Sequence, residues 1–403
     1  MASHNTVATL DGLYKKIYGD KGPIDLIPDN SILQDLIPFA KAERTGHSFN
    51  TPVVLSTEHG FAYGLADETI TLNDSVAATL KEVSVKGTQL IGQASLNYDA
   101  ASRSASSPAA FMNGAHLVVK NLYQGASKRL EASLLYGTKG IGTVDSLSSQ
   151  DIVLKAASFA DGLWMGMENA VIDVYQANGT VRQAGLVVSA VNPDTYTITV
   201  VGTTTGIADT DVIFMKGSYG KECYGIDAIA TNTGSMFGVD ASAYSLWKGS
   251  SYAAGGAALT MAKVLNAVSK AVSKGGLNDE CVVLVHPSSW NNLNADQAAL
   301  RQYVSDEKEA KNGFGAITYR GANGLIKVMS HPMVKRGEAF VLPVKEMKRI
   351  GSQDISSATP GRSDEIFLHS STLSAYVLRV YSNQAIVCMK PAQMVKITGI
   401  VPA

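Results

Sequence analysis

Residues 107–137 read SPAAFMNGAHLVVKNLYQGASKRLEASLLYG. Ser107 is a favoured N-cap residue and Pro108 suits the first position of a helix, whereas Gly137 is placed as the residue that follows a helix end. Between them, apolar residues recur at spacings of three and four and form one stripe. The stretch therefore predicts a helix over 108–136 that is roughly 43 Å long, which exceeds the width of a small domain.

The apolar stripe supplies most of the candidate structural and assembly residues. Its members are Phe111, Ala115, Val118, Val119, Leu122, Ala126, Leu130 and Leu134. We expect Val118, Leu122 and Leu130 to be buried under a sheet that residues 320–330 form with the C-terminal strands. Gly125 costs helix propensity, up to ~1 kcal/mol, so we expect another backbone to cross closely there or the helix to bend.

Trp247 is the remaining candidate. The three tryptophans, Trp164, Trp247 and Trp290, each lie in a helical or turn context beside apolar neighbours. This is typical of anchors in a core or an interface, and it is unlike a stacking platform for nucleic acid. We therefore select Trp247 as a structural or assembly residue.

Residues 1–50 alternate turn formers with short apolar pieces. They predict an extended arm and then a short helix, capped at Asp29 or Asn30, kinked by Pro38 and ending at Ala42. An extended arm has no core of its own, so we expect it to lie on another part of the assembly.

Residues 51–98 indicate a projecting β-hairpin. TPVVLS begins it, and KEVSVKGTQLIGQASL returns with period-two alternation. Neither strand is apolar on both faces, and an isolated hairpin is marginally stable in water. We therefore expect contacts of this hairpin with other subunits.

The middle of the chain changes character twice. Residues 150–166 suggest a helix, and residues 170–217 suggest four short strands joined by Gly and Asn turns. The strands predict a small β-barrel or sandwich inserted between α/β parts, although one more sheet layer of the main domain fits the pattern too. Its expected core is Val171, Val174, Val188, Ile198, Val200 and Ile213.

The last part of the chain mixes helices and strands. Residues 260–274 form a clear amphipathic pattern that Thr260 caps and Gly275 ends. CVVLVHP then reads as a fully buried strand, and SSWNNLNADQAALRQY as a helix. From 317 onward the pattern is β again to the C-terminus.

Composition restricts the function. The formal net charge is −1, from 34 basic and 35 acidic residues, which excludes the basic footprint of a dedicated nucleic-acid binder. Charged residues are only 17% of the chain, below the roughly 25% that is typical of soluble domains. This fits a protein that buries much of its surface against copies of itself, and a quiet monomer remains the alternative.

The sequence carries no catalytic signature. HExxH, GxSxG and the P-loop pattern are all absent, and the seven histidines are scattered without metal-ligand spacing. His286 and His331 each precede a proline at a strand end, so we expect turn-forming or hydrogen-bonded roles. A triad of His286, Asp279 and a serine is not ruled out by sequence. We predict no enzyme activity, no cofactor and no metal.

The start of the sequence has no basic stretch followed by an apolar one, and no window approaches the ~18 apolar residues of a membrane helix. The three cysteines are far apart, and Cys281 and Cys388 sit in apolar runs that predict buried thiols. We expect a cytosolic product without a membrane partner.

The order of these parts resembles the major capsid protein of tailed bacteriophages, the fold type named after phage HK97. The resemblance rests on the arm, the hairpin and the long helix ending in RLEASLLYG, and on three later stretches. These are GIDAIATNTGSMFGVDASAYSLWKG (225–249), VLVHPSSWNNL (283–293) and LIKVMSHPMVKRGEAFVLP (325–343). It extends over essentially the whole chain.

The resemblance implies an α+β capsid fold with named parts. These are an N-terminal arm (1–50), an extended loop (51–98), a spine helix with the start of a peripheral domain (99–149), a first part of a central domain (150–169), an inserted β subdomain (170–217), a second part of the central domain (218–320), and a peripheral sheet with C-terminal strands (321–403).

The resemblance also implies a function. A protein of this kind self-assembles into hexamers and pentamers of an icosahedral shell around double-stranded DNA, which it contacts non-specifically. Its expected partners are copies of itself, a scaffolding protein, a portal and decoration proteins, in a virion assembled in the host cytoplasm. The arm begins close to Met1, which suggests a separate scaffolding protein.

Three other functions remain open at this point. An encapsulin-type cellular compartment would have the same fold around a protein cargo. A cytosolic enzyme would have a site assembled across the fold. A surface adhesin is disfavoured by the missing secretion signal.

Overall fold

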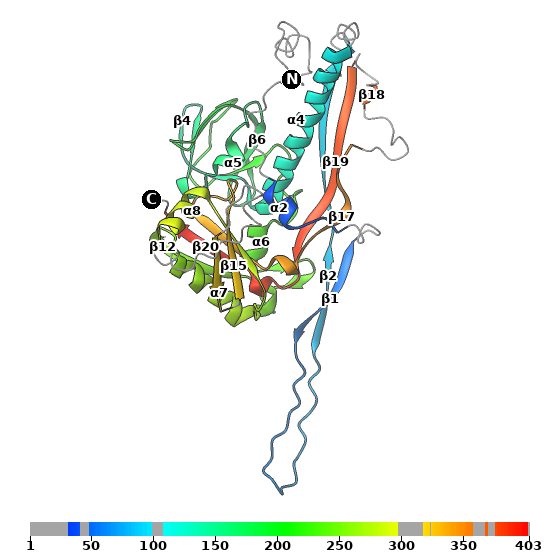
Figure 1. Ribbon diagram of the computed structural model, residues 1–403, viewed down its shortest axis with the longest axis vertical. Coiled ribbons are helices and arrows are strands. Elements are labelled where there is room, and N and C mark those ends of the chain that lie inside the picture. Colours follow the sequence, from blue (N-terminus) through cyan, green and yellow to red (C-terminus); the bar gives the residue numbers. More distant parts are fainter. Residues whose placement is uncertain are drawn as a thin grey trace.

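The computed structural model describes residues 31–40, 48–98, 108–296, 317–322, 324–357, 367–369 and 375–401, with the backbone alone described at 108–116, 317, 367 and 369. The expectations for 1–30 and 41–47, which make up most of the N-terminal arm and its helix cap, lie outside the described residues. Figure 1 shows an elongated molecule with a long helix, two sheets, a barrel and a projecting hairpin.

The long helix is present as α4 (Pro108–Leu135). It lies along a four-stranded sheet of β3 (Thr88–Asn97), β17 (Met347–Ser356), β18 (Phe367–His369) and β19 (Ala375–Cys388), as Figure 1 shows. Strand β19 is the centre of this sheet, because it pairs with all three of the others. The C-terminal strands therefore cover the apolar stripe as expected, but residues 320–330 do not.

The hairpin consists of β1 (Phe49–Ser56) and β2 (Thr79–Val85), paired antiparallel from Phe49↔Val85 onward. It projects from the body along the long axis (Figure 1). The expectation that 51–98 is one hairpin is wrong in its last third, because β3 leaves β1 and joins β19 instead. Gly87 permits the switch, since a Cβ there would clash with Oδ1 of Asn383.

Six strands form a closed antiparallel barrel in the order β4-β5-β8-β7-β6-β9. They are β4 (Gly142–Ser148), β5 (Asp151–Leu154), β6 (Val171–Tyr175), β7 (Val181–Asn192), β8 (Thr197–Val201) and β9 (Val212–Met215). The four strands expected within 170–217 are present. Of their expected core, Val174, Val188, Ile198, Val200 and Ile213 are buried and Val171 is half-buried.

The expected helix over 150–166 is wrong. Its residues form β5, a short 3-10 helix η3 (Ala156–Ser158) and a single turn α5 (Asp161–Trp164). Ile152 and Leu154 alternate with half-buried neighbours and point into the barrel, a period-two pattern that the run of large apolar residues obscures. The barrel therefore begins near Gly142, within the segment assigned above to the peripheral domain.

The second sheet has six strands in the order β12-β20-β16-β13-β15-β14. They are β12 (Ser250–Ala257), β13 (Cys281–Val285), β14 (Ile317–Gly321), β15 (Gly324–Ser330), β16 (Glu338–Leu342) and β20 (Val395–Ile400). The assignment of all of 321–403 to a peripheral sheet is thus wrong for β15, β16 and β20. Strand β13 has β15 beside it as a parallel neighbour, with α8 in the crossover between them.

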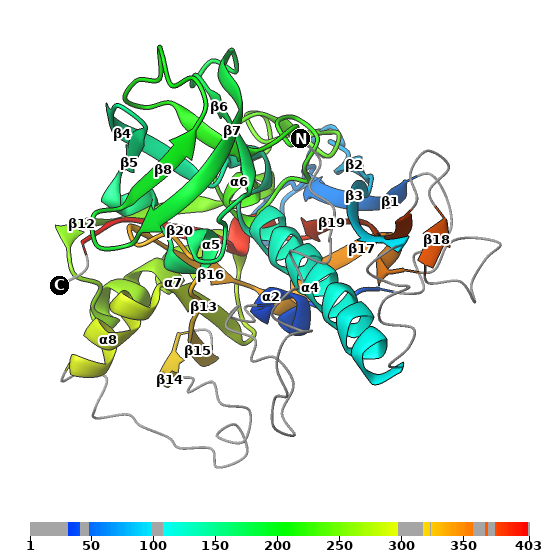
Figure 2. The same cartoon turned by 90° about the horizontal axis from the view of Figure 1, so that it is seen from above.

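The two faces of this sheet are covered differently. Helix α7 (Met261–Gly275) packs on one face with Cys281, Val283 and Val285, while Val282 and Leu284 face the core that the sheet shares with the barrel. Figure 2 shows the barrel and the pair α7 and α8 (Pro287–Ala295) on opposite sides of the sheet. Thr260 caps α7 as expected, by accepting a hydrogen bond from the Lys263 N–H.

The remaining described elements are short. They are the helices α2 (Ile32–Leu36) and α6 (Ile226–Ala230), the strands β10 (Ser235–Met236) and β11 (Val239–Asp240), and the 3-10 helices η2 (Gly137–Lys139), η4 (Ser245–Trp247), η6 (Val344–Glu346) and η7 (Pro391–Gln393). Helix α2 ends before Pro38, well short of the expected Ala42. Cys223, Cys281 and Cys388 are buried and form no disulfide within the described residues. Within the described part of the chain, no helix is long and apolar enough to cross a membrane.

Candidate assembly surface

The segment 57–78, here called the hairpin tip, joins β1 to β2 and exposes large apolar side chains. Tyr63 is 95% exposed, Leu72 83%, Leu65 73% and Phe61 71%. Folded soluble chains expose single apolar residues routinely, but a group of this size marks an interaction site. The hairpin tip is therefore the leading candidate for a subunit contact.

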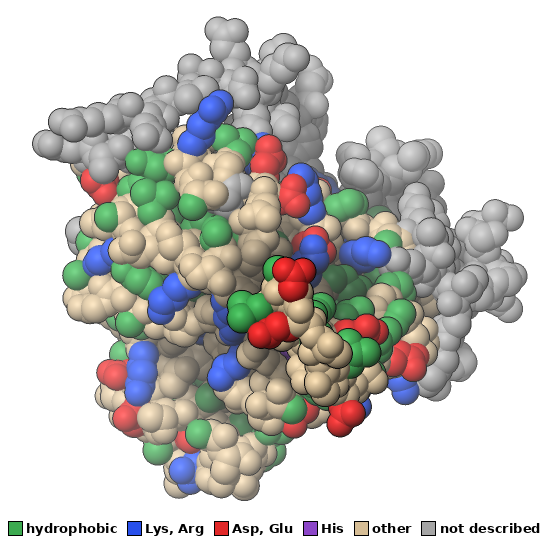
Figure 3. Space-filling model, turned by 90° about the horizontal axis from the view of Figure 1, so that it is seen from below, with side chains coloured by type: hydrophobic (Ala, Val, Ile, Leu, Met, Phe, Trp, Pro, Cys, Tyr) green, Lys and Arg blue, Asp and Glu red, His purple; other side chains and the backbone are tan. Residues whose placement is uncertain are grey.

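The hairpin tip is also acidic. Its charged residues are Glu58, Asp67, Glu68 and Asp74, with no Lys or Arg between 57 and 78. Figure 3 looks at the molecule from the hairpin end, where acidic and hydrophobic side chains gather at the tip. A partner surface must therefore cover apolar groups and tolerate or neutralise negative charge.

The paired strands of the hairpin are fixed to the body, whereas the hairpin tip is not. Val83 and Val85 are buried at the base, and the Ser84 N–H donates to the carbonyl of Phe237 at 2.9 Å. Leu55, at the end of the ladder next to the tip, is also buried. Towards the tip, the ladder ends in an isolated bridge between His59 and Val76. The hairpin thus holds its direction but lacks packing along its outer part.

The spine-helix candidates face the sheet with different burial. Val118 and Leu130 are 6% and 4% exposed, and Leu122 is half-buried. Leu122 packs against Gly92 of β3, where a Cβ would lie 3.1 Å from its Cδ1. Leu122 therefore holds the helix to β3 within one subunit, and Val118 and Leu130 are buried in the same subunit.

Gly125 and Trp247 lie apart from the sheet contact. Gly125 is exposed, and no atom of the described residues lies within 4 Å of a Cβ built on it. No described part of this chain crosses at Gly125, so a crossing by the backbone of a neighbouring subunit, or a bend of the helix, stays a prediction. Trp247 is 1% exposed and its indole N–H donates to the carbonyl of Met236 at 3.1 Å, so it anchors the core of the subunit.

Glu131, a residue that the sequence pattern missed, holds the N-terminal helix. Its carboxylate is fully buried and accepts hydrogen bonds from the backbone N–H of Leu33 and, at 3.3 Å, of Gln34. It thereby supplies the N-terminal cap that α2 lacks from its own N-cap residue. The available signal was an acidic residue in the mostly apolar run LEASLLYG.

Arg349 holds the other end of α2. Its guanidinium donates to the carbonyls of Ile37 and, at 3.2 Å, of Gln34, and to Oε1 of Gln384 at 3.0 Å. Burial lowers the pKa of Arg349, while the carboxylates of Asp354 and Glu131 act in the opposite direction. Two buried charges on different elements thus fix the start of the described chain onto the spine helix and β17.

The two histidines before prolines have the hydrogen-bonded roles expected of them. His331 Nδ1 accepts from the Met333 N–H at 3.1 Å, and its Nε2 lies 2.9 Å from Oε1 of Glu131. Nδ1 of His286 accepts from the Ser288 N–H at 3.2 Å and caps α8. In both rings the accepting Nδ1 places the proton on Nε2.

The triad considered from the sequence does not form. Asp279 accepts a hydrogen bond from Lys345 at 2.8 Å, and His286 Nε2 instead donates to Asp161 at 3.0 Å. Ser288 Oγ lies 2.7 Å from Nδ1 of His286. The hydrogen-bonded series Ser288, His286 and Asp161 has a structural role. His286 is buried, and Arg336 binds both oxygens of Asp161 at 2.9 and 3.0 Å.

Asp161 joins the barrel to the six-stranded sheet. Partial burial raises the pKa of its carboxyl, but hydrogen bonds from His286 and Arg336 outweigh this and hold the pKa below its usual value. Arg336 also stacks on Tyr196 of the barrel, 4.9 Å from the ring centre. The ionised carboxylate is therefore a structural tie between two parts of the fold.

A buried ionic cluster fixes the end of the spine helix. Lys396 Nζ lies 2.7 Å from Asp227 and 2.7 Å from Glu338. Burial lowers the pKa of Lys396, but these two carboxylates raise it overall. Lys335 lies 4.0 Å above the ring of Tyr136, at the helix end. In the described part of the chain, no group of three or more His, Cys, Asp and Glu residues is arranged to hold a metal ion.

Comparisons with known proteins identify this fold. No family model and no curated protein matches the sequence. Among solved structures, the capsid of cyanophage A-1(L) aligns with a TM-score of 0.55 and 13% identity, over 98% of this chain and 99% of that chain. The capsid of a native GTA particle aligns with a TM-score of 0.52 and 8% identity, over 99% and 100%.

These similarities define the class of fold. The chain has the fold of shell-forming viral capsid proteins. It is the HK97-like fold of tailed-bacteriophage major capsid proteins, with the extended loop, spine helix and mixed sheets in the same chain. At such low identity the comparison concerns the fold, and the function rests on the surfaces described above.

Proposed function

We propose that this chain is a major capsid protein that assembles into hexamers and pentamers of an icosahedral shell enclosing a phage double-stranded DNA genome. The observation that carries the proposal is the hairpin tip, with four large apolar side chains more than two-thirds exposed on a projecting hairpin. Such a hairpin is stable only when another surface covers it.

Covering the hairpin tip contributes a sizeable free energy to association. Burying a Leu or Phe side chain fully is worth about 1.5–3 kcal/mol. Phe61, Leu65 and Leu72 together thus offer several kcal/mol per contact, before the cost of association. In a closed symmetric shell every copy both offers a tip and receives one, so that gain is repeated at each interface.

The low content of charge agrees with this assignment. Only 17% of residues are charged, which leaves neutral surface that copies of the same chain bury. The proposal places the chain in the virion, assembled in the host cytoplasm, with a scaffolding protein, a portal and decoration proteins as further partners. It assigns the chain no catalytic residue and no cofactor.

The alternatives differ in what the shell encloses and in whether there is a shell. An encapsulin-type compartment would enclose a protein cargo, so nuclease-protected DNA in purified particles separates the two. For the enzyme alternative, Ser288 is a candidate nucleophile, but its hydroxyl faces the buried ring of His286 that caps α8. This geometry favours a structural role of Ser288 and His286 at the start of α8 over a catalytic one.

The tip is tested by sedimentation of two matched variants. Leu65→Asp combined with Leu72→Asp places charge on the hairpin tip, whereas Val201→Asp places charge at a residue that is 63% exposed on the barrel. We expect the Val201 variant to assemble like the parent and the tip variant to remain as folded subunits with unchanged circular dichroism. Assembly of the tip variant at parental yield contradicts the proposed role of the tip.

A further inference from the structure

One stretch of the chain is basic although the whole is neutral. Residues 241–278 contain four lysines, Lys248, Lys263, Lys270 and Lys274, and no Asp, Glu or Arg. Three of the lysines lie on α7, and the fourth precedes β12. A local basic surface of this kind attracts anions even when the total charge is −1.

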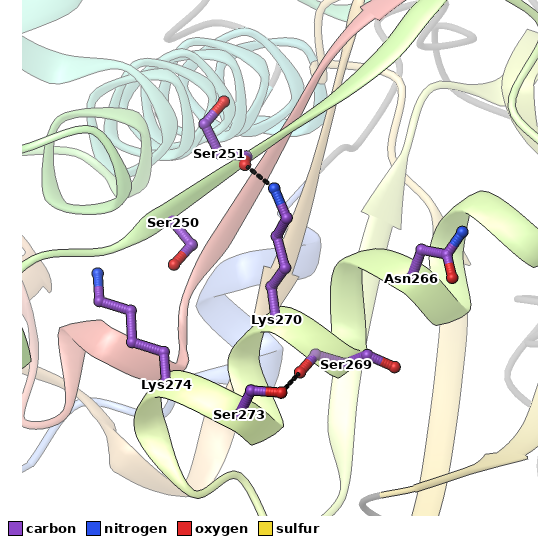
Figure 4. Close-up of a pocket in the computed structure, with 7 residues that line it drawn as sticks. All are labelled: Ser250, Ser251, Asn266, Ser269, Lys270, Ser273 and Lys274. Atoms are coloured by element: carbon purple, nitrogen blue, oxygen red, sulfur yellow. Dashed lines mark hydrogen bonds between the residues drawn. The ribbon is translucent and has the colours of Figure 1, made fainter.

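The lysines surround a groove between the edge strand β12 and helix α7. The groove has a volume of about 430 Å³. As Figure 4 shows, its lining residues are Ser250, Ser251, Asn266, Ser269, Lys270, Ser273 and Lys274. The five residues from α7 follow the spacing of a single helix face, so the helix presents a continuous polar and basic row to the groove.

Backbone carbonyls hold the ammonium groups in place. Lys270 Nζ donates to the carbonyl of Ser251 at 2.9 Å, and Lys274 Nζ donates to that of Gly249 at 2.9 Å and to that of Lys248. An ammonium group has three N–H donors, so donors remain on both lysines. No carboxylate of the described residues forms an ion pair with these two lysines.

The groove therefore concentrates positive charge without neutralising it. Burial lowers the pKa of Lys274, and the nearby Lys248 ammonium lowers it further. An anion in the groove would relieve this repulsion. Lys270 and Lys274 stand one helical turn apart, about 6 Å along the axis. The hydroxyls of Ser250 and Ser269 are donors suited to phosphate oxygens, whereas the Ser273 hydroxyl donates to the carbonyl of Ser269 at 2.8 Å.

The groove also has a defined place in the fold. Helix α7 covers the face of the six-stranded sheet that points away from the barrel (Figure 2). The groove lies at the β12 edge of the sheet and belongs to neither the hairpin nor the spine helix. A polyanion bound there would leave the hairpin tip accessible for subunit contacts.

We propose that this groove binds the phosphodiester backbone of double-stranded DNA, with Lys270 and Lys274 contacting phosphates and Ser250 and Ser269 donating hydrogen bonds. The proposal rests on the proposed function, since it names the surface by which the shell subunit contacts its genome. A shallow row of lysines and small hydroxyls fits a uniform polyanion and has no apolar pocket to select a peptide side chain.

The test measures binding of the full chain to a 30-bp duplex, a length of about three helical turns, by fluorescence anisotropy at several salt concentrations. Lys270→Gln combined with Lys274→Gln is compared with Lys216→Gln combined with Lys221→Gln, two exposed lysines near the barrel. We expect roughly tenfold weaker binding for the groove variant only, and a salt-dependence slope smaller by about 1.8 for two lost phosphate contacts.

A charge-preserving variant and particle imaging complete the test. Lys270→Arg with Lys274→Arg should retain parental binding, which excludes an effect through misfolding of β12. Equal DNA affinity of the parent and the groove Gln variant overturns the proposal. A Gln variant that binds DNA normally but no longer forms particles also overturns the proposal. That result would indicate that the groove binds an acidic segment of another copy of the chain. A parent that forms no particles contradicts the proposed function, while DNA binding by its subunits is still measured separately.

Discussion

At the scale of single residues, charge and burial explain the structural role of a side chain better than residue type does. Glu131 is the clearest example, because a fully buried carboxylate is costly unless its oxygens are satisfied. Two backbone N–H groups and His331 satisfy them. Sequence periodicity identifies the stripe but does not show this partner set, since α2 and His331 are distant in the chain.

The stripe residues allow a graded prediction for stability. Leu130 is 4% exposed and sits in the main core, so Leu130→Ala should destabilise the subunit by ~2–5 kcal/mol. Leu122 is half-buried against Gly92, so Leu122→Ala should cost clearly less. Urea unfolding of unassembled subunits measures both, and a larger loss at Leu122 would contradict the packing described here.

Glu222 gives a prediction for the pH dependence of stability. Burial raises the pKa of its carboxyl from 4.5 to about 7, although the Arg129 guanidinium acts in the opposite direction. Between these values the folded state binds a proton that the unfolded chain does not, so this group lowers stability as pH rises from 4.5 to 7. Glu222→Gln removes the effect and should stabilise the subunit at pH 8, on the order of 1 kcal/mol, but not at pH 4.

Thermal unfolding at both pH values checks this, with Asp194→Asn, an exposed carboxyl on the barrel, as the control for loss of one charge. A gain at pH 8 that is equally present at pH 4 would show that the benefit of the Glu222→Gln substitution comes from packing and not from titration of the carboxyl.

At the scale of elements, local pattern predicts what is locally determined. The caps and the stripe predict helix α4 to within one residue, and the pattern of α7 is similarly clear. The partner of β15 could not be predicted, because its pairing with β13 depends on a crossover through α8 and on residues outside both strands. For the same reason β2 and β3 look like one strand in the sequence, since the contact of Gly87 with Asn383 is visible only in the fold.

Gly125 yields a sharper prediction. Since no described atom lies within 4 Å of its Cβ position, Gly125→Ala should stabilise the helix of the free subunit by up to ~1 kcal/mol. If a neighbouring subunit crosses there or the helix bends during shell expansion, the same variant will assemble poorly. Melting temperature and particle yield are measured together, and normal particles at normal yield would show that the glycine has no assembly role.

The barrel determines the expected result of deleting 170–217. Because β4 and β5 close the barrel with β6 to β9, the deletion leaves Val144, Ile152 and Leu154 without their covering strands. We therefore expect insoluble protein, whereas a central fold that survived intact would be expected only for an independent insertion. Solubility after expression, compared with the parent, decides this, and a soluble folded deletion variant would contradict the closed barrel.

At the scale of the whole molecule, the shape and the surface lead to one function. The hairpin projects from a body in which the spine helix, both sheets and the barrel are already packed. Its tip exposes apolar groups that no described part of the chain covers. The barrel lies on one face of the six-stranded sheet, and the basic α7 groove lies on the opposite face. The two roles that we propose, shell assembly through the tip and DNA contact through the groove, would use separate surfaces.

The central claim is that copies of this chain build a closed shell. Electron microscopy of the purified, unmodified protein, after expression together with its scaffolding protein where one is required, tests it most directly. We predict closed icosahedral particles in which hexamers and pentamers are resolved and each hairpin tip lies on a neighbouring subunit. Dispersed monomers under all these conditions, with the hairpin folded back on its own body, would contradict it.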